Sequence, residues 1–235
     1  MTSAISLISS MATRGVLAEL AQAYQATSGL EVSIVSVGGV DAAKRVQAGE
    51  LFDVVLLGSD AIDRLMAECH LVAGSRIDWV RSTVAVAVRA GTPHPDLKDG
   101  EAVRNAVLAA PSLSYSTGPS GTYLMQLFDR WGIADQVRSK MVQAPPGVPV
   151  GSLVARGDVA LGFQQLSELL PLSGIDVVGE LPSDVQYVTT FSAARGAAAA
   201  SVRGSVFEEP VQQWLNFLRS RVAAQTIRRH GMSPA

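Results

Sequence analysis

The sequence predicts an α/β protein with two lobes, each built on a mostly parallel sheet flanked by helices. Short β-branched strand patterns alternate with helical patterns along the chain, which is typical of βαβ units. Two apolar, extended stretches, residues 83–91 and 185–196, are placed so that the chain between them forms an inserted lobe. We expect residues 1–83 with 190–235 to form the first lobe and residues 84–189 the second. The two stretches would be hinge strands, with a ligand cleft between the lobes.

The strands are predicted from short runs rich in β-branched residues that stop at small or polar residues. In the first lobe these are Ala4–Ser9, Val32–Val35, Val54–Leu57 and, where the chain returns, Tyr187–Ser192. In the second lobe they are Val84–Val88, Leu113–Tyr115, Ala160–Phe163 and Val177–Val178.

The helices are predicted from apolar residues three and four positions apart. Residues 13–28 carry one such stripe, residues 122–131 carry another that stops at Gly132, and residues 209–221 form the last. Shorter helices are expected at residues 40–48, from residue 61, and at residues 166–170. The tract of alanines after Gly196 is low in complexity but too short for its composition alone to indicate disorder.

Composition narrows the class of protein. Of 235 residues, 48% are hydrophobic and 17% charged, which indicates a globular chain with an ample core. A net charge of −2 over mixed signs gives no reason to expect a nucleic-acid partner or a membrane surface. No segment approaches the roughly 20 apolar residues of a membrane span. We expect a monomer that does not insert directly into a membrane.

Five predicted strand ends open into polar junctions just before a helix. They are Ser9-Ser10, Ser36 to Gly39, Gly58 to Asp60, Tyr115 to Gly121, and Gln164-Gln165. A helix N-terminus has unpaired N–H groups and the positive end of its dipole, so it binds anions without a basic side chain. In open α/β sheets such junctions line the ligand crevice. Each junction taken alone is better explained as an ordinary helix cap or turn than as a ligand contact.

Other catalytic and metal motifs are absent from the sequence. The single cysteine, Cys69, excludes an intrachain disulfide and a multi-cysteine metal site, and we expect it to be buried. The three histidines, His70, His94 and His230, lie outside every junction, so neither a Ser/His triad nor a metal centre is expected. There is no Walker loop, no GxGxxG and no GxSxG. We expect no metal and no cofactor.

Over nearly its whole length the chain resembles the molybdate-binding type of bacterial solute-binding protein, with the periplasmic-binding-protein type II fold. The resemblance rests on the order of ISSMATRGVLAELAQAY, SVGGVDAAKRVQAGELFDVVLLGSDAIDRL, TVAVAVRAG, LSYSTGPSGTYLMQLFDRWGI and VPVGSLVARGDVALGFQQLSELL. The piece AGELFDVVLLGSD is similar to the family's "AGxxADVxxxAS" stretch. This resemblance implies lobes that close on a small anion and hand it to an ABC transporter permease.

Carried over to this sequence, the resemblance implies ligand contacts at the junctions. The candidate ligand-binding residues are Ser9, Ser10, Arg14, Gly38, Gly39, Ser59, Ser116, Ser120, Gly121, Thr122, Gln164 and Gln165. Gly38-Gly39 stands where the family usually has a serine pair, and Gln164 stands where a tyrosine is expected. These departures favour an organic di- or tricarboxylate over molybdate. Arg14 is either a carboxylate clamp or a solvated first-turn arginine.

One branch of this family resembles aconitate isomerase, which leaves binding and catalysis both open. An allylic proton shift needs a positioned base and donors for the carboxylates, but no cofactor. The candidate catalytic residues are Ser10, Tyr115 and Tyr123. Asp60 is the one carboxylate in a junction, and an aspartate at a helix start is more often a cap than a base. No convincing general base is therefore apparent. A third reading is a cytosolic anion sensor.

The start of the sequence bears on localisation. Met1-Thr2-Ser3 leads directly into the first predicted strand, with no basic segment and no long apolar segment. We expect a periplasmic protein whose signal peptide has been removed from this sequence. The alternative is a cytoplasmic protein.

Overall fold

The computed structural model describes residues 4–235, and the chain divides into two compact units. Unit 1 comprises the residues up to Arg81 together with Thr190–Ala235, and unit 2 comprises Ser82–Thr189. Strands β4 (Ile77–Arg89) and β9 (Val188–Arg195) each begin in one unit and end in the other. Residues 1–3, where the sequence analysis looked for a leader, lie outside the described residues.

Unit 1 is built on a sheet whose central strand has a parallel neighbour on each side. Strand β1 (Ile5–Ser10) pairs in parallel with β2 (Val32–Val37) and with β3 (Val54–Gly58). Strand β9 pairs antiparallel with β3, and β10 (Ser233–Pro234) pairs antiparallel with β4. The sheet is therefore mixed, with its parallel part at β1, β2 and β3.

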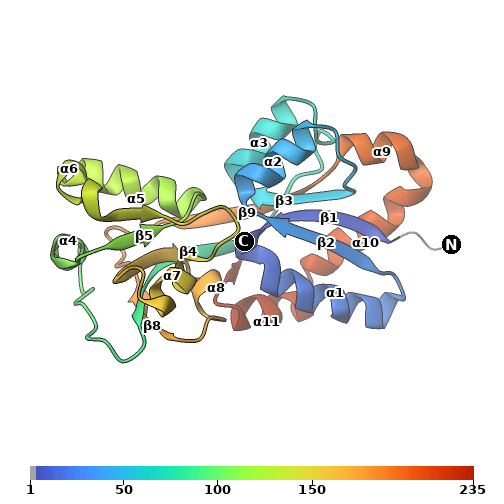
Figure 1. The fold of residues 1–235 in the computed structure, drawn as a ribbon. Coiled ribbons are helices and arrows are strands. Elements are labelled where there is room, and N and C mark those ends of the chain that lie inside the picture. The colour runs from blue at the N-terminus through green and yellow to red at the C-terminus, as the bar shows by residue number, and fades with distance from the viewer. Residues whose placement is uncertain (1–3) are drawn as a thin grey trace. The chain divides into compact units, whose positions relative to one another are not determined.

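Helices cover both faces of the unit 1 sheet (Figure 1). They are α1 (Arg14–Ser28), α2 (Gly39–Gln47), α3 (Ser59–Ala67), α9 (Ala197–Arg203), α10 (Glu208–Leu218) and α11 (Arg221–Arg229), with 3-10 turns at Met11–Thr13 and Ser205–Phe207. Alternate strand residues point to opposite faces. Leu7 and Leu56 accordingly pack with the face of α1, α10 and α11, whereas Ile8 and Val55 pack with α2 and α3.

Unit 2 repeats the arrangement of a central strand between two parallel neighbours. Strand β5 (Leu113–Tyr115) lies between β6 (Met141–Gln143) and β7 (Leu161–Gln165), parallel to both. Strand β4 pairs antiparallel with β7 and with β8 (Ile175–Glu180). The helices are α4 (Gly100–Ala109), α5 (Pro119–Arg130), α6 (Ala134–Val137), α7 (Val150–Arg156) and α8 (Leu166–Leu169), with a 3-10 turn at Arg138–Lys140.

The two faces of β7 carry different side chains, and this determines how unit 2 is assembled. Phe163 packs into a core with α4, α5 and α6, as does Leu161. Gly162 lies on the other face, where an added Cβ would come within 2.6 Å of Val154 and 2.9 Å of Val150 in α7. The next residue on that face is Gln164, which lies among α7 and α8. Figure 1 shows α7 and α8 on the opposite side of the unit from α5.

The predicted strands and helices are present in the structure, but several elements were not predicted. These are helices α4, α6 and α7 and strands β6 and β10. Strand β4 also runs from Ile77 to Arg89, beyond the predicted Val84–Val88. The alanine tract forms α9. The helix predicted for residues 209–221 ends at Leu218, because Ser220 caps a separate helix, α11, by accepting from Ala223 N.

The unit 1 core contains two buried indoles that differ in one respect. Trp79 Nε1 donates to the Leu218 carbonyl at 2.9 Å, whereas Trp214 Nε1 has no hydrogen-bond partner among residues 4–235. Replacement of either indole by phenylalanine removes a similar volume, but only Trp79→Phe leaves a carbonyl unpaired. We expect Trp79→Phe to lower the free energy of unfolding by about 1 kcal/mol more than Trp214→Phe in urea titrations. Equal losses would contradict a stabilising role for this hydrogen bond.

Candidate functional site

In unit 1, the carboxyl ends of β1, β2 and β3 bring together the first three predicted junctions. The parallel register places Ser9 beside Ser36, and their hydroxyl oxygens lie 2.8 Å apart. Ser9 is fully buried. Because β3 lies on the other side of β1, Ser59, the first residue of α3, belongs to the same edge of the sheet.

Ser10 is the most informative residue at this edge. Its side chain is only 7% exposed, and its hydroxyl has no hydrogen-bond partner among the described residues. A buried hydroxyl without a partner costs free energy, so it is a ready donor for a ligand. A Cβ added at Gly39 would lie 3.9 Å from Ser10 Cβ, which places this hydroxyl near the first turn of α2. Gly38 and Gly39 have no side chains that could block a ligand from the Ser10 hydroxyl.

The charged residues of this edge lie at its margin. Arg14 is the first residue of α1 and is exposed, so it is free to move toward a carboxylate. Asp41 and Asp60 lie in the first turns of α2 and α3, and neither side chain caps its helix. Asp60 is exposed.

In unit 2, the loop between β5 and α5 forms a second polar strand end. The Ser116 and Ser120 hydroxyls lie 3.1 Å apart, and Gly118 N donates to Ser116 Oγ at 3.3 Å. A Cβ added at Gly121 would lie 1.8 Å from the Ser116 carbonyl oxygen, so this turn requires glycine at position 121. Thr122 is exposed in the first turn of α5.

The two glutamines at the end of β7 have different surroundings. Gln164 is 2% exposed; its Oε1 accepts from Val150 N at 2.8 Å and its Nε2 donates to Glu168 Oε1 at 2.8 Å. The amide of Gln165 fits its neighbours when Oε1 accepts from Thr189 and Nε2 donates to Ser82 Oγ at 3.0 Å. Gln165 therefore joins β4 and β9, whereas Gln164 is directed to the face of α7 and α8.

The two candidate catalytic tyrosines differ in the contacts that they make. Tyr115 ends β5 at the polar edge. The Tyr123 hydroxyl donates to the Val185 carbonyl at 2.8 Å, and its ring stacks on Tyr187 with centroids 4.7 Å apart. Arg130 lies over the same ring and donates to the hydroxyl. These contacts give Tyr123 a packing role within unit 2.

Glu168 is a site residue that the sequence analysis missed. It lies in α8, directly after β7, and its carboxylate is bonded by Gln164. Burial raises the pKa of the Glu168 carboxyl to about 7, although the Gln164 hydrogen bond favours the charged form. The signal available in the sequence was a glutamate four residues after Gln164, in the first turn of a predicted helix.

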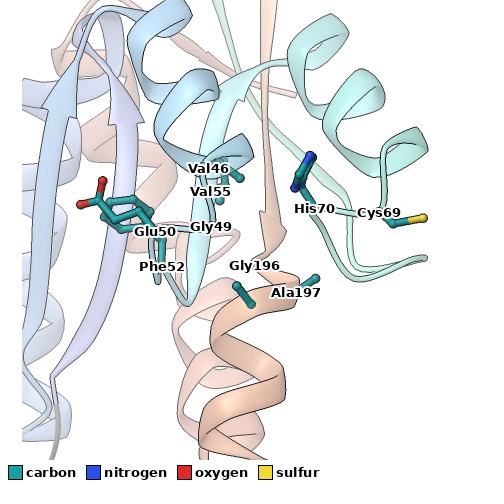
Figure 2. A pocket seen from close by; sticks show the side chains of 10 residues that line it. Val46, Gly49, Glu50, Phe52, Val55, Cys69, His70, Gly196 and Ala197 are labelled. Atoms are coloured by element: carbon teal, nitrogen blue, oxygen red, sulfur yellow. The ribbon is translucent and has the colours of Figure 1, made fainter.

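A separate pocket of about 260 Å³ lies at the other end of unit 1 (Figure 2). Its lining includes Val46 and Phe52, with His70 and Cys69 from the chain after α3. Phe52 precedes β3, so the pocket is at the amino end of that strand, away from Ser10. The expectation that Cys69 is buried is wrong: Cys69 is exposed, in the turn that follows α3, with a φ of 62° (Figure 2).

Within residues 4–235, no group of three or more His, Cys, Asp or Glu side chains is placed to hold a metal ion. The helices of this part of the chain also include none with the length and apolar character of a membrane span.

The model of the family described as bacterial extracellular solute-binding protein matches residues 5–233. The chain belongs to this family. A relative named aconitate isomerase, from Pseudomonas sp., is 36% identical over 98% of this chain and 87% of its own length. The molybdate-binding protein ModA of Azotobacter vinelandii is 26% identical over 80% of this chain and 73% of its own length.

Solved structures of other solute-binding proteins share the fold. The periplasmic molybdate-binding protein of Azotobacter vinelandii superimposes with a TM-score of 0.78 at 19% identity, over 97% of this chain and 98% of its own. A protein titled tungstate ABC transporter, from Geobacter sulfurreducens, gives a TM-score of 0.75 at 15% identity over the same shares. The predicted family and the predicted two-lobed fold class, with helices flanking the sheet, are therefore confirmed.

Stability should depend on pH through Glu168. A carboxyl whose pKa rises from 4.5 unfolded to about 7 folded contributes stability that is complete below pH 4.5 and is lost as pH rises through 7. We expect the free energy of unfolding to fall by about 1–3 kcal/mol between pH 5 and pH 8 in urea titrations, and Glu168→Gln to remove most of that fall. The exposed Glu180, replaced by glutamine, is the control. An identical pH dependence in both variants would contradict the assignment.

Proposed function

We propose that this protein is an isomerase that interconverts the cis and trans forms of a small unsaturated tricarboxylate of the aconitate type. The observation that carries the proposal is the 36% identity, over 98% of the chain, to a protein named aconitate isomerase. Catalysis would use the polar strand ends described above, with no metal and no cofactor.

The strand ends supply the donors that a polycarboxylate needs. Carboxylates are bound well by hydroxyl and backbone N–H groups at helix N-termini. In unit 1 the Ser10 hydroxyl is buried and unpaired within the described residues, and α2 begins beside it. In unit 2 Ser116 and Ser120 line the start of the 12-residue helix α5. We propose that donors of this kind bind the carboxylates of the ligand, with Arg14 available for a further carboxylate.

The reaction is a proton shift that leaves the composition of the substrate unchanged. A base removes a proton from the methylene carbon, and the electrons of that C–H bond form the new double bond. The electrons of the old double bond then take a proton at the former alkene carbon. No electrons are lost and no water is consumed, so the donors need only stabilise the charge that develops on the adjacent carboxylate.

A second candidate function is binding of a small anion for uptake. The family description and the molybdate- and tungstate-related names of several relatives support it. In that case a monomeric protein in the periplasm would deliver the anion to an ABC transporter permease, and closure would follow the tighter binding of the closed state. Glycines at 38 and 39 and an amide at 164 favour an organic di- or tricarboxylate as the ligand in this case too.

Incubation of the protein with trans-aconitate tests catalysis directly. We expect proton NMR to show signals of the cis isomer, and in D₂O we expect methylene protons to be replaced by deuterium.

Thermal unfolding with the same compound measures binding, and stabilisation should reach about 2.7 kcal/mol at a hundredfold excess over Kd. Stabilisation without any new species would eliminate the isomerase and leave the uptake protein. Stabilisation by molybdate and not by aconitate would contradict the proposal that the ligand is an organic carboxylate.

Variants of the donors test whether these strand ends bind the ligand. We expect Ser10→Ala and Ser120→Ala each to weaken binding of trans-aconitate by about 1–2 kcal/mol in calorimetry. Arg14→Ala should cost about 1.5–3 kcal/mol, with the exposed Arg64→Ala as control. Unchanged affinity for Ser10→Ala or Ser120→Ala would exclude that hydroxyl from the site, and unchanged affinity for Arg14→Ala would exclude the clamp.

A further inference from the structure

We infer that Glu168 is the base that transfers the proton and that Gln164 is the residue that positions it. This inference rests on the proposed isomerase function and names the catalytic residue that the function requires. It places the chemistry in unit 2, at the end of β7.

The geometry of Glu168 suits a base. Its Oε1 accepts from Gln164 Nε2 at 2.8 Å, while its Oε2 accepts no hydrogen bond from residues 4–235. One oxygen is thus held in place and the other is available to a substrate. Glu168 as a residue is half-buried and is not enclosed in the core of unit 2.

Gln164 is itself held in place. It is 2% exposed, and its Oε1 accepts from the backbone N–H of Val150 at 2.8 Å. The amide plane is therefore set by a group of α7, and the NH₂ must point to Glu168. A base supported in this way keeps its orientation without any help from the substrate.

Glu168 and the serines of the β5–α5 loop follow neighbouring strands of the unit 2 sheet. Strand β7 pairs in parallel with β5, which places Phe163 beside Tyr115, so both strands end at the same edge. The loop with Ser116 and Ser120 follows β5, and α8 with Glu168 follows β7. Helix α5 also packs against β7. Donors for a carboxylate and a carboxylate base are therefore provided by neighbouring strand ends of one unit.

The charges around Glu168 suit a group that both takes and gives a proton. Helix α8 packs against α7 and β7 and, through Leu169, against β8 and the unit 2 part of β4. Besides Glu168, the charged residues of these elements are Arg156, Asp176, Glu180 and Arg89. Arg156 lies in the last turn of α7 and pairs with Asp158 at 2.8 Å. The pKa of Glu168, raised to about 7 by burial, then gives comparable amounts of acid and base near neutral pH. That balance is favourable for a proton carrier.

The proton step can be written for this residue. The Glu168 carboxylate takes the proton from the methylene carbon, and the C–H electron pair enters the new C=C bond. The carboxylic acid so formed returns a proton to the other allylic carbon, which receives the electrons of the old double bond. Glu168 ends the cycle as the carboxylate with which it began.

The test compares Glu168→Gln with Glu180→Gln, in which an exposed glutamate of the same unit is changed. We expect Glu168→Gln to lower kcat for trans-aconitate by a hundredfold or more and to leave its Kd within threefold. Glu180→Gln should match the wild type in both. Glu168→Asp, which keeps the charge but withdraws the oxygens, should retain more activity than Glu168→Gln and provides a second variant if the first does not fold.

The role of Gln164 is tested by the pH profile. In the wild type, kcat/KM should rise with pH as Glu168 loses its proton, with a midpoint near 7. Gln164→Leu removes a hydrogen bond that lowers this pKa, so the midpoint should move to higher pH. A lower rate with an unmoved midpoint would show that Gln164 only supports the fold.

The outcomes separate the two claims. If the wild type converts trans-aconitate and Glu168→Gln does so within threefold of it, Glu168 is not the base and the isomerase function stands. If the wild type binds trans-aconitate but neither converts it nor exchanges its protons with D₂O, the proposed function and this inference both fall.

Discussion

The feature on which the rest of the structure depends is the parallel pairing of a central strand with a neighbour on each side, once in each unit. In unit 1 this strand is β1 and in unit 2 it is β5. Parallel pairing brings three carboxyl ends to one edge, where the chain must turn into helices and cannot continue the ladder. Polar groups gathered at such an edge face N–H groups rather than packed aliphatic side chains. The candidate site follows from the pairing more than from any single motif.

The alternation of side chains across each strand decides which polar residues are available there. In β7 the side chain of Phe163 enters a core while that of Gln164 points to the opposite face. A shift by one residue would exchange these directions and bury the amide among aliphatic groups. The contacts on both faces prevent this shift: Gly162 leaves room for α7, and the adjacent Gln165 joins β4 to β9. Packing of the cores thus sets the orientation of the group that bonds Glu168.

The fold is shared by proteins whose names refer to different anions. Solved structures with this fold are named for molybdate and tungstate, while a relative aligned over nearly this whole chain is named aconitate isomerase. Hydroxyl and backbone N–H donors at strand ends suit any small anion, because they neutralise charge without a fixed cation. The proposed proton shift requires one addition, a positioned base. Burial beside the Gln164 amide raises the pKa of the Glu168 carboxyl to about 7, which suits that proposed role.

Local pattern by itself determined most of the elements and the edges at which polar residues gather. The strand Leu113–Tyr115 was predicted with its observed bounds, and Ser9, Ser10 and Ser120 were placed at strand ends or helix starts where the structure has them. These features follow from side-chain periodicity and from caps, which are properties of neighbouring residues.

Only the tertiary structure decided which of those residues are free to act. Tyr123 is engaged by Val185, 62 positions away, and Gln165 by strands from two other parts of the chain. The hydroxyl of Ser10 is unpaired among the described residues because of what surrounds it, and the proton affinity of Glu168 depends on its burial. Burial and long-range partners depend on how the chain packs in space, and local pattern does not encode them.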